Sequence, residues 1–209
     1  DALGRAFLLS DGEHVPEAPI PWGRLFRNRV VMVFAGAMAL GSAVWTLLEA
    51  ALPLNLAQRF GLGSRDIGLA FGAMALAHTL SSPFMGRLSD RIGRARVLRI
   101  GLAASVVLMP LPALLPSPWT VGLAMMALGF NASFLLSPCS PAVADQVERM
   151  DSQSFASGFS ILNIAYSVGM ALGPLLSGPI IDVLGFGGAL AVVGAASGLF
   201  LFATRGINT

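Results

Sequence analysis

Long uncharged stretches alternate with short charged segments along this chain of 209 residues. Within five such stretches Glu49 and His78 are the only Asp, Glu, Lys, Arg or His residues: 30–58, 67–86, 100–144, 152–181 and 183–204. A membrane-spanning helix needs about 20 mostly apolar residues. The third stretch is too long for one helix, and the prolines between positions 110 and 118 divide it. The pattern predicts six membrane-spanning helices, near residues 30–57, 67–86, 97–115, 119–144, 155–181 and 183–204.

The composition supports this interpretation. Hydrophobic residues make up 55% of the chain and charged residues 11%, and the mean hydropathy is +0.75. A soluble domain usually has about a quarter charged residues, so this chain lacks the polar surface that water requires. A single cysteine excludes a disulfide scaffold and a multi-cysteine metal site. We therefore expect an all-α polytopic membrane protein with no metal and no cofactor.

The arginines predict how the six helices are oriented. All 13 basic residues are Arg, and eleven of them fall on the side that holds both chain ends and the loops near 87–96 and 145–154. Only Arg59 and Arg65 fall on the other side. Because basic loops face the cytoplasm, we expect both termini there, in a plasma or inner membrane. The net charge of +2 then reflects topology, and we expect no nucleic-acid partner.

The ends of the chain are predicted to lie outside the membrane. Residues 1–29 contain several acids and three prolines, without the long apolar core of a signal peptide. We interpret 1–29 as a cytoplasmic linker-like segment of a longer chain, 30–204 as the transmembrane bundle and 205–209 as a cytoplasmic tail.

Glu49 is the first candidate site residue, because an acid inside a membrane is costly, about 2.5–3.5 kcal/mol for Asp at a helix centre. It lies 20 residues past Arg29, about 30 Å along a helix, and so toward the outer face. Ser42, Trp45 and Glu49 share one helical face, which suits a cavity wall. Pro53 lacks the N–H that would bond the carbonyl of Glu49 and weakens the helix there. We expect Glu49 to bind substrate or a proton; the alternative is a carboxylate that snorkels to the interface.

Three further polar residues lie inside predicted helices. His78 titrates near neutral pH and suits proton coupling or a cavity contact, although a neutral His bonded to a neighbouring helix explains it equally well. Asn131 and Asn163 can bind substrate or simply join helices.

The fifth predicted helix has small residues at every fourth position: Ala165, Gly169, Gly173 and Ser177. Such a ridge allows close helix packing. Pro174 removes a backbone hydrogen bond and should bend this helix, and Gly178 belongs to the same packing and kink region. Pro138 and Pro141 should likewise disturb the fourth helix near its cytoplasmic end.

The loop after the second predicted helix reads GRLSDRIGRAR over residues 86–96. Its two glycines allow a tight turn, its acid can pair with an arginine, and its arginines hold it in the cytosol. The run closely resembles the G-x-L-a-D-r-x-G-r-[kr] signature of the major facilitator superfamily, in which this loop latches one conformation. The resemblance implies a conformational gate made of Gly86, Asp90, Arg91, Gly93 and Arg94.

Two other segments extend the resemblance. LEAALP at 48–53 looks like the first helix of a half in the drug:proton antiporter branch, vesicular amine transporters included. Residues 169–178 look like that branch's glycine-rich antiporter motif, with Ser177 in place of one glycine. Such transporters have two six-helix halves joined by a linker. The chain looks like the C-terminal half, since 126–129 lacks the Arg of N-terminal halves; the N-terminal half is the alternative.

The resemblance also assigns positions. Glu49 matches a cavity acid of the seventh helix in the vesicular-type relatives, and His78 falls where they carry an aromatic residue. Ser133 and Asn163 match acids of their tenth and eleventh helices. Both are uncharged here, which departs from a vesicular-type proton relay and its amine selectivity.

We therefore expect half of a secondary active transporter that exports small amphipathic or cationic solutes with proton coupling, by alternating access. The alternatives are an uptake permease of the same superfamily and a non-transporting scaffold or sensor. An enzyme is not expected, because no acid supports a Ser197–His78 pair. The expected partners are a small-molecule substrate, protons, the lipid bilayer and a second six-helix half, from the same polypeptide or from a second copy.

Overall fold

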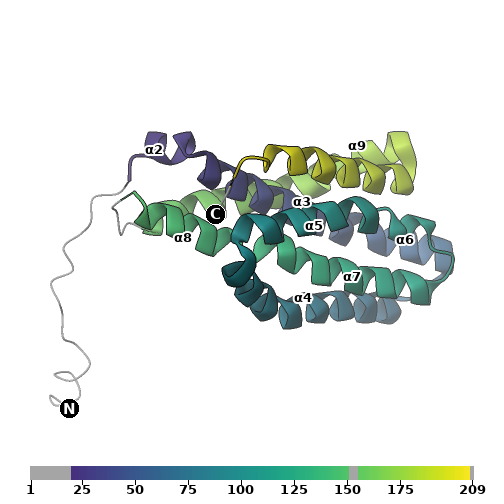
Figure 1. Ribbon diagram of the computed structural model, residues 1–209. Helices are drawn as coiled ribbons and strands as arrows, with labels where there is room; N and C mark the ends of the chain where they lie inside the picture. The colour runs from purple at the N-terminus through teal and green to yellow at the C-terminus, as the bar shows by residue number, and fades with distance from the viewer. Residues whose placement is uncertain (1–19, 151–154, 208–209) are drawn as a thin grey trace, which may run out of the picture.

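A computed structural model describes residues 20–150 and 155–207 of the chain, and these residues form helices and no strand (Figure 1). The helices are α2 (Trp22–Arg27), α3 (Arg29–Phe60), α4 (Ser64–Ile92), α5 (Arg94–Leu108), α6 (Leu111–Leu114), α7 (Pro118–Leu136), α8 (Cys139–Glu148) and α9 (Phe155–Ala203). The first 19 residues of the predicted linker, the loop at 151–154 and the last two residues of the predicted tail lie outside this description.

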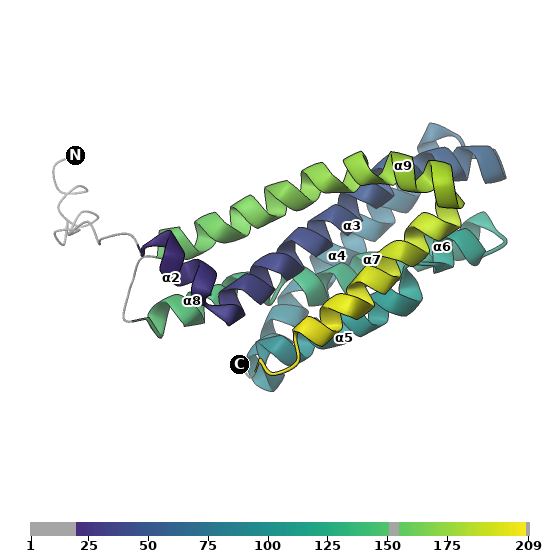
Figure 2. The same cartoon turned by 90° about the horizontal axis from the view of Figure 1, so that it is seen from above.

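Among the residues that the structure describes, five helical stretches are long and apolar enough to cross a membrane: 29–60, 64–92, 94–114, 118–148 and 155–203. The last one, α9, has 49 residues and contains Gly185 in a non-helical conformation, with φ 71° and ψ 171°. Glycine adopts a positive φ without steric cost, and Figure 2 shows α9 reversing direction within its length. Its two arms, 155–184 and 186–203, give the fold six spanning helices.

Glycine and proline residues decide where several helices end. Gly61 closes α3 in the left-handed conformation, and Gly93 separates α4 from α5 with φ 97°. Helical structure is also interrupted between α5 and α6, where Pro110 precedes α6, and between α7 and α8, where Pro138 precedes α8. Within α9 the backbone dihedral angles depart from helical values at Gly185.

Two clusters of buried apolar residues form the core, one toward each end of the bundle. The first cluster includes Phe34, Leu98 and Val147, and the second includes Leu52, Met74 and Met125. Many large apolar side chains instead point outward, and Val183, for example, is 81% exposed. An apolar exterior of this kind suits a lipid solvent.

Parts of the predicted linker and tail pack into the bundle. Leu25 of α2 and Ile207 near the end of the chain are both buried in the first cluster. Arg99 donates to the carbonyl groups of Thr204 and Ile207, and Arg29 donates to the carbonyl of Arg205 at 2.9 Å. Residues 20–29 and 205–207 are therefore integral parts of the helical structure.

Candidate functional site

Three of the predicted site residues form a continuous row between α3 and α4. The indole Nε1 of Trp45 donates to a carboxylate oxygen of Glu49 at 2.7 Å, one helical turn away. The ring of Trp45 also contacts the imidazole of His78, with centroids 5.5 Å apart and planes inclined by 56°. Glu49 is exposed, whereas Trp45 and His78 are half-buried. The row therefore runs from an accessible carboxylate to a partly enclosed imidazole.

Two serines extend this row into α7. The Ser133 hydroxyl lies 3.0 Å from His78 Nδ1 and 2.6 Å from the Ser81 hydroxyl, and Ser133 is fully buried. From the sequence, Ser133 was expected only to be an uncharged residue where the resemblance implies an acid. Its pairing with His78 was missed, because 55 residues separate them and only the packing of α4 on α7 joins them.

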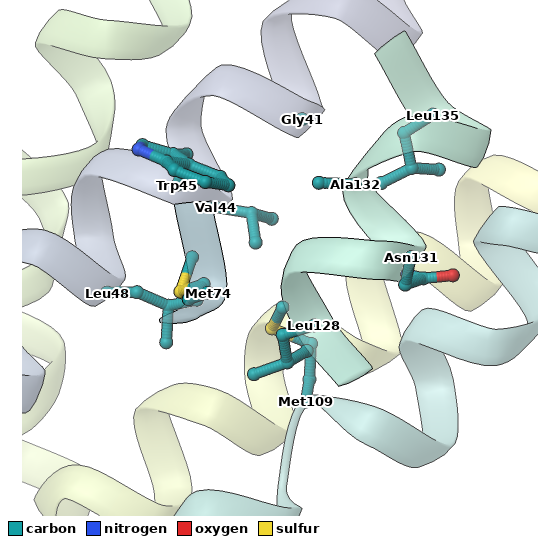
Figure 3. Close-up of a pocket in the computed structure, with 10 residues that line it drawn as sticks. All are labelled: Gly41, Val44, Trp45, Leu48, Met74, Met109, Leu128, Asn131, Ala132 and Leu135. Atoms are coloured by element: carbon teal, nitrogen blue, oxygen red, sulfur yellow. The ribbon is translucent and has the colours of Figure 1, made fainter. Parts of the chain in front are cut away.

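A small pocket lies beside this row (Figure 3). It is lined by Gly41, Val44, Trp45, Leu48, Met74, Met109, Leu128, Asn131, Ala132 and Leu135. Its volume is about 10 Å³, which is room for one water molecule at most. The ring of Trp45 borders the pocket while its nitrogen points away from it. This pocket therefore has no room for a solute larger than water.

The two predicted asparagines do not join the row. The amide of Asn131 points away from the pocket in Figure 3 and donates to the Ser105 hydroxyl of α5 at 2.8 Å. Asn131 is buried, so this hydrogen bond joins α7 to α5. Asn163 is exposed on the first arm of α9, outside the set of residues that line the pocket.

The predicted gate contains an arginine held between two carboxylates. Arg94 contacts Asp90 at 2.8 Å and Asp145, at the far end of α8, at 2.6 Å. Position 145 was predicted to lie in a loop, whereas Asp145 lies inside α8. Its place at the edge of a long uncharged stretch was the signal that could have identified it. Arg91 is exposed. The bonds of Arg94 join the α4–α5 turn to α8.

Of the two glycines expected to form the turn, only Gly93 lies in it. Gly93 is at the turn and has a positive φ, which favours glycine. Gly86 lies inside α4, and a Cβ atom added to it would meet nothing within 4 Å. The tight turn therefore depends on Gly93, and Gly86 leaves an open position on the surface of α4.

The glycines of α9 also differ. A Cβ atom at Gly169 would overlap Ser42 and the carbonyl of Ala39, and one at Gly173 would overlap Thr46. These two glycines let the first arm of α9 approach α3 closely, and the Ser42 hydroxyl donates to the carbonyl of Tyr166 at 3.0 Å. Gly178 faces open space.

The long apolar helices, the polar row between α3 and α4 and the bonds of Arg94 at one end define a polytopic α-helical membrane protein. A family model of the Major Facilitator Superfamily matches residues 33–206, and the chain belongs to this family. Its helices form one six-helix half of the family fold.

Several curated proteins are similar to this chain. The chromaffin granule amine transporter of Rattus norvegicus is 26% identical over 81% of the chain, and the synaptic vesicular amine transporter of Bos taurus is 22% identical over 96%. A probable transporter of Streptomyces coelicolor is 33% identical over 77% of the chain. The matched regions cover 33% to 39% of these relatives, so the chain spans little more than a third of their length.

Proposed function

We propose that this chain is half of a secondary active transporter that exports small amphipathic or cationic solutes in exchange for protons. One observation carries the proposal: the exposed carboxylate of Glu49 is oriented by Trp45, whose ring also contacts His78. Two titratable groups thus share one aromatic side chain on one continuous row. The relatives named as amine transporters support a solute that carries a positive charge.

Coupling would follow from competition at Glu49. A deprotonated carboxylate attracts a cation, and the adjacent indole face of Trp45 can add a cation–π contact. A protonated carboxylate loses that attraction, so a proton that reaches Glu49 favours release of the solute. His78, in ring contact with Trp45, lies where it can exchange protons at the enclosed end of the row.

Alternating access would need a second six-helix half opposite this row. Two helices of this half leave broad surfaces free. In the most apolar 18-residue stretch of each helix, only 11% of the residues of α4 and 22% of those of α9 are buried. Open positions at Gly68, Gly72 and Gly86 on α4 would allow another helix to approach closely. The pairs of Arg94 with Asp90 and Asp145 would close one end as the halves rock.

The Glu49→Gln variant tests this function in the intact protein, reconstituted in liposomes under an imposed proton gradient. Gln keeps an oxygen that can accept from Trp45 but cannot exchange a proton. We expect the pH dependence of efflux to disappear and the apparent affinity for a cationic solute to fall roughly tenfold, equivalent to about 1.4 kcal/mol.

The matched control is Asp182→Asn, which removes another exposed carboxylate from α9 outside the row. It should leave both properties unchanged. Unaltered efflux in Glu49→Gln would remove Glu49 from the mechanism. Accumulation in the opposite direction would identify an uptake permease, and the absence of any flux in the parent protein would identify a scaffold or sensor.

A further inference from the structure

The short helix α2 carries two aromatic side chains that the core does not cover. Trp22 is 50% exposed and Phe26 is 54% exposed, and their rings stack with centroids 6.0 Å apart. Leu25, between them in sequence, is fully buried. At 3.6 residues per turn, these three positions fall within an arc of about 100°. The apolar face of α2 thus starts in the core and continues outward across two aromatic rings.

The position of α2 at the end of the bundle is held by Asn28. This residue ends α2 with an extended backbone, and its Oδ1 accepts from the N–H groups of Val30 and Val31 at the start of α3. Its amide also donates to Gln146 of α8 at 3.3 Å. Figure 1 shows α2 at the end of the bundle, beside the start of α3, the first spanning helix. Its aromatic rings therefore lie where the membrane surface meets the bundle.

The other side of α2 is basic. Arg24 and Arg27 are both exposed, and none of the carboxylates in the described part of the chain forms an ion pair with either. Aromatic rings favour the boundary between lipid headgroups and acyl chains, and arginine favours anionic headgroups with a bidentate geometry for phosphate. The two faces of α2 therefore match the two layers of an anionic membrane surface.

We infer that α2 is an interfacial helix that binds the anionic phospholipids of the leaflet at this end of the bundle. Trp22 and Phe26 insert at the level where acyl chains begin, and Arg24 and Arg27 contact lipid phosphates. With α3 already spanning the membrane, this contact orients the helix bundle rather than anchoring it. The surface lies apart from Glu49, Trp45 and His78, so the inference is independent of the proposed transport activity.

Quenching by brominated lipids tests the depth of Trp22. The intact protein and its Trp22→Phe variant are reconstituted in phosphatidylcholine vesicles that contain phosphatidylglycerol brominated either near the headgroup or near the chain end. The difference between the two proteins isolates the emission of Trp22 from that of Trp45 and Trp119. We expect strong quenching by the shallow label and weak quenching by the deep one. Trp22 emission that neither label quenches would overturn the inference. Quenching by aqueous iodide would then show that the ring lies in water, and no quenching by iodide would show that another protein segment covers it.

Charge variants test the headgroup contact. Phosphatidylglycerol is titrated into the detergent-solubilised intact protein, and its apparent affinity is measured from the rise in thermal midpoint. Arg24→Gln and Arg27→Gln should each weaken binding about fivefold, as expected for about 1 kcal/mol per surface arginine. The matched control Arg65→Gln removes an exposed arginine from the other end of the bundle and should change nothing. Equal losses in all three variants, or no loss in any, would overturn the proposed contact.

Discussion

At the scale of single residues, a hydrogen-bonded chain controls the imidazole of His78. Ser81 lies 2.7 Å from the carbonyl of Ala77, and Ser133 lies between Ser81 and His78 Nδ1. The Ser133 hydroxyl also donates to the carbonyl oxygen of His78 at 3.0 Å, and the Ser81 hydroxyl lies 3.1 Å from the same carbonyl. The ring and the backbone of His78 thus share one buried pair of serines, which holds the imidazole in place between α4 and α7.

The Ser133→Ala variant removes the central link of this chain. Leaving a buried donor without a partner costs about 1–3 kcal/mol, so we expect a lower thermal midpoint in detergent and an altered pH dependence of transport. The control is Ser160→Ala, because the Ser160 hydroxyl is exposed and bonds only the carbonyl of Ala156 in its own helix. A pH profile in Ser133→Ala that matches the parent protein would contradict the role of the serine chain.

At the scale of helices, close approach is achieved where a side chain is missing. Gly169 and Gly173 of α9 lie against α3, and Gly129 of α7 lies against the carbonyl of Met74 in α4. Such contacts bring backbones together and add dispersion energy where the hydrophobic effect between helices is absent. The same spacing contributes little where a glycine faces outward, as Gly178 does.

A pair of glycine substitutions separates packing from helix propensity. In Gly169→Ala the new methyl group would overlap Ser42 and the backbone of Ala39, so α3 and α9 must move apart. We expect a destabilisation of about 1–3 kcal/mol, typical of overpacking. In Gly122→Ala of α7 the methyl group meets open space, and the better helix propensity of Ala leaves stability equal or slightly higher. Thermal unfolding of both variants in detergent measures the difference; equal midpoints would show that the ridge is not tightly packed.

At the scale of the whole molecule, the bundle is apolar around its sides and carries its arginines at its ends. Exposed residues of α4 and of both arms of α9 are largely apolar, as the lipid or a second half requires. Arg94, with its partners Asp90 and Asp145, and the basic face of α2 lie at the end predicted to face the cytoplasm. Arg59 and Arg65 lie at the opposite end. The molecule thus has a chemical polarity along its axis.

Cysteine labelling tests that orientation. Cys139 is completely buried, so the native thiol should resist a membrane-impermeant maleimide. In right-side-out membranes, we expect Arg65→Cys to react with the maleimide while the membranes are intact. We expect Arg87→Cys to react only after the membranes are permeabilised, because residue 87 is predicted to face the cytoplasm. Both arginines are exposed, which makes the pair matched in accessibility. Labelling of the two positions in the opposite order would reverse the predicted topology.

Much of the fold follows from the sequence alone, and the reason is the thickness of the bilayer. An uncharged stretch of about 20 residues has few alternatives to a spanning helix, so the helix count, the all-α class and the family signature at 86–96 are local properties. Glycine and proline also act locally, although the reversal of α9 lies at Gly185, three residues beyond the charged residue expected to separate the last two helices. Such boundaries depend on backbone geometry that composition does not encode.

The partners of the polar residues were decided by the tertiary structure. Ser133 meets His78 across 55 residues, and Asp145 meets Arg94 across 51. Asn131 turned toward α5 rather than into a cavity, and Asn163 remained apart on α9. Sequence spacing identifies which residues share a face of one helix, as it did for Trp45 and Glu49. Which helix lies opposite that face is a property of packing, because the free energy of a buried hydrogen bond exists only once two distant segments are in contact.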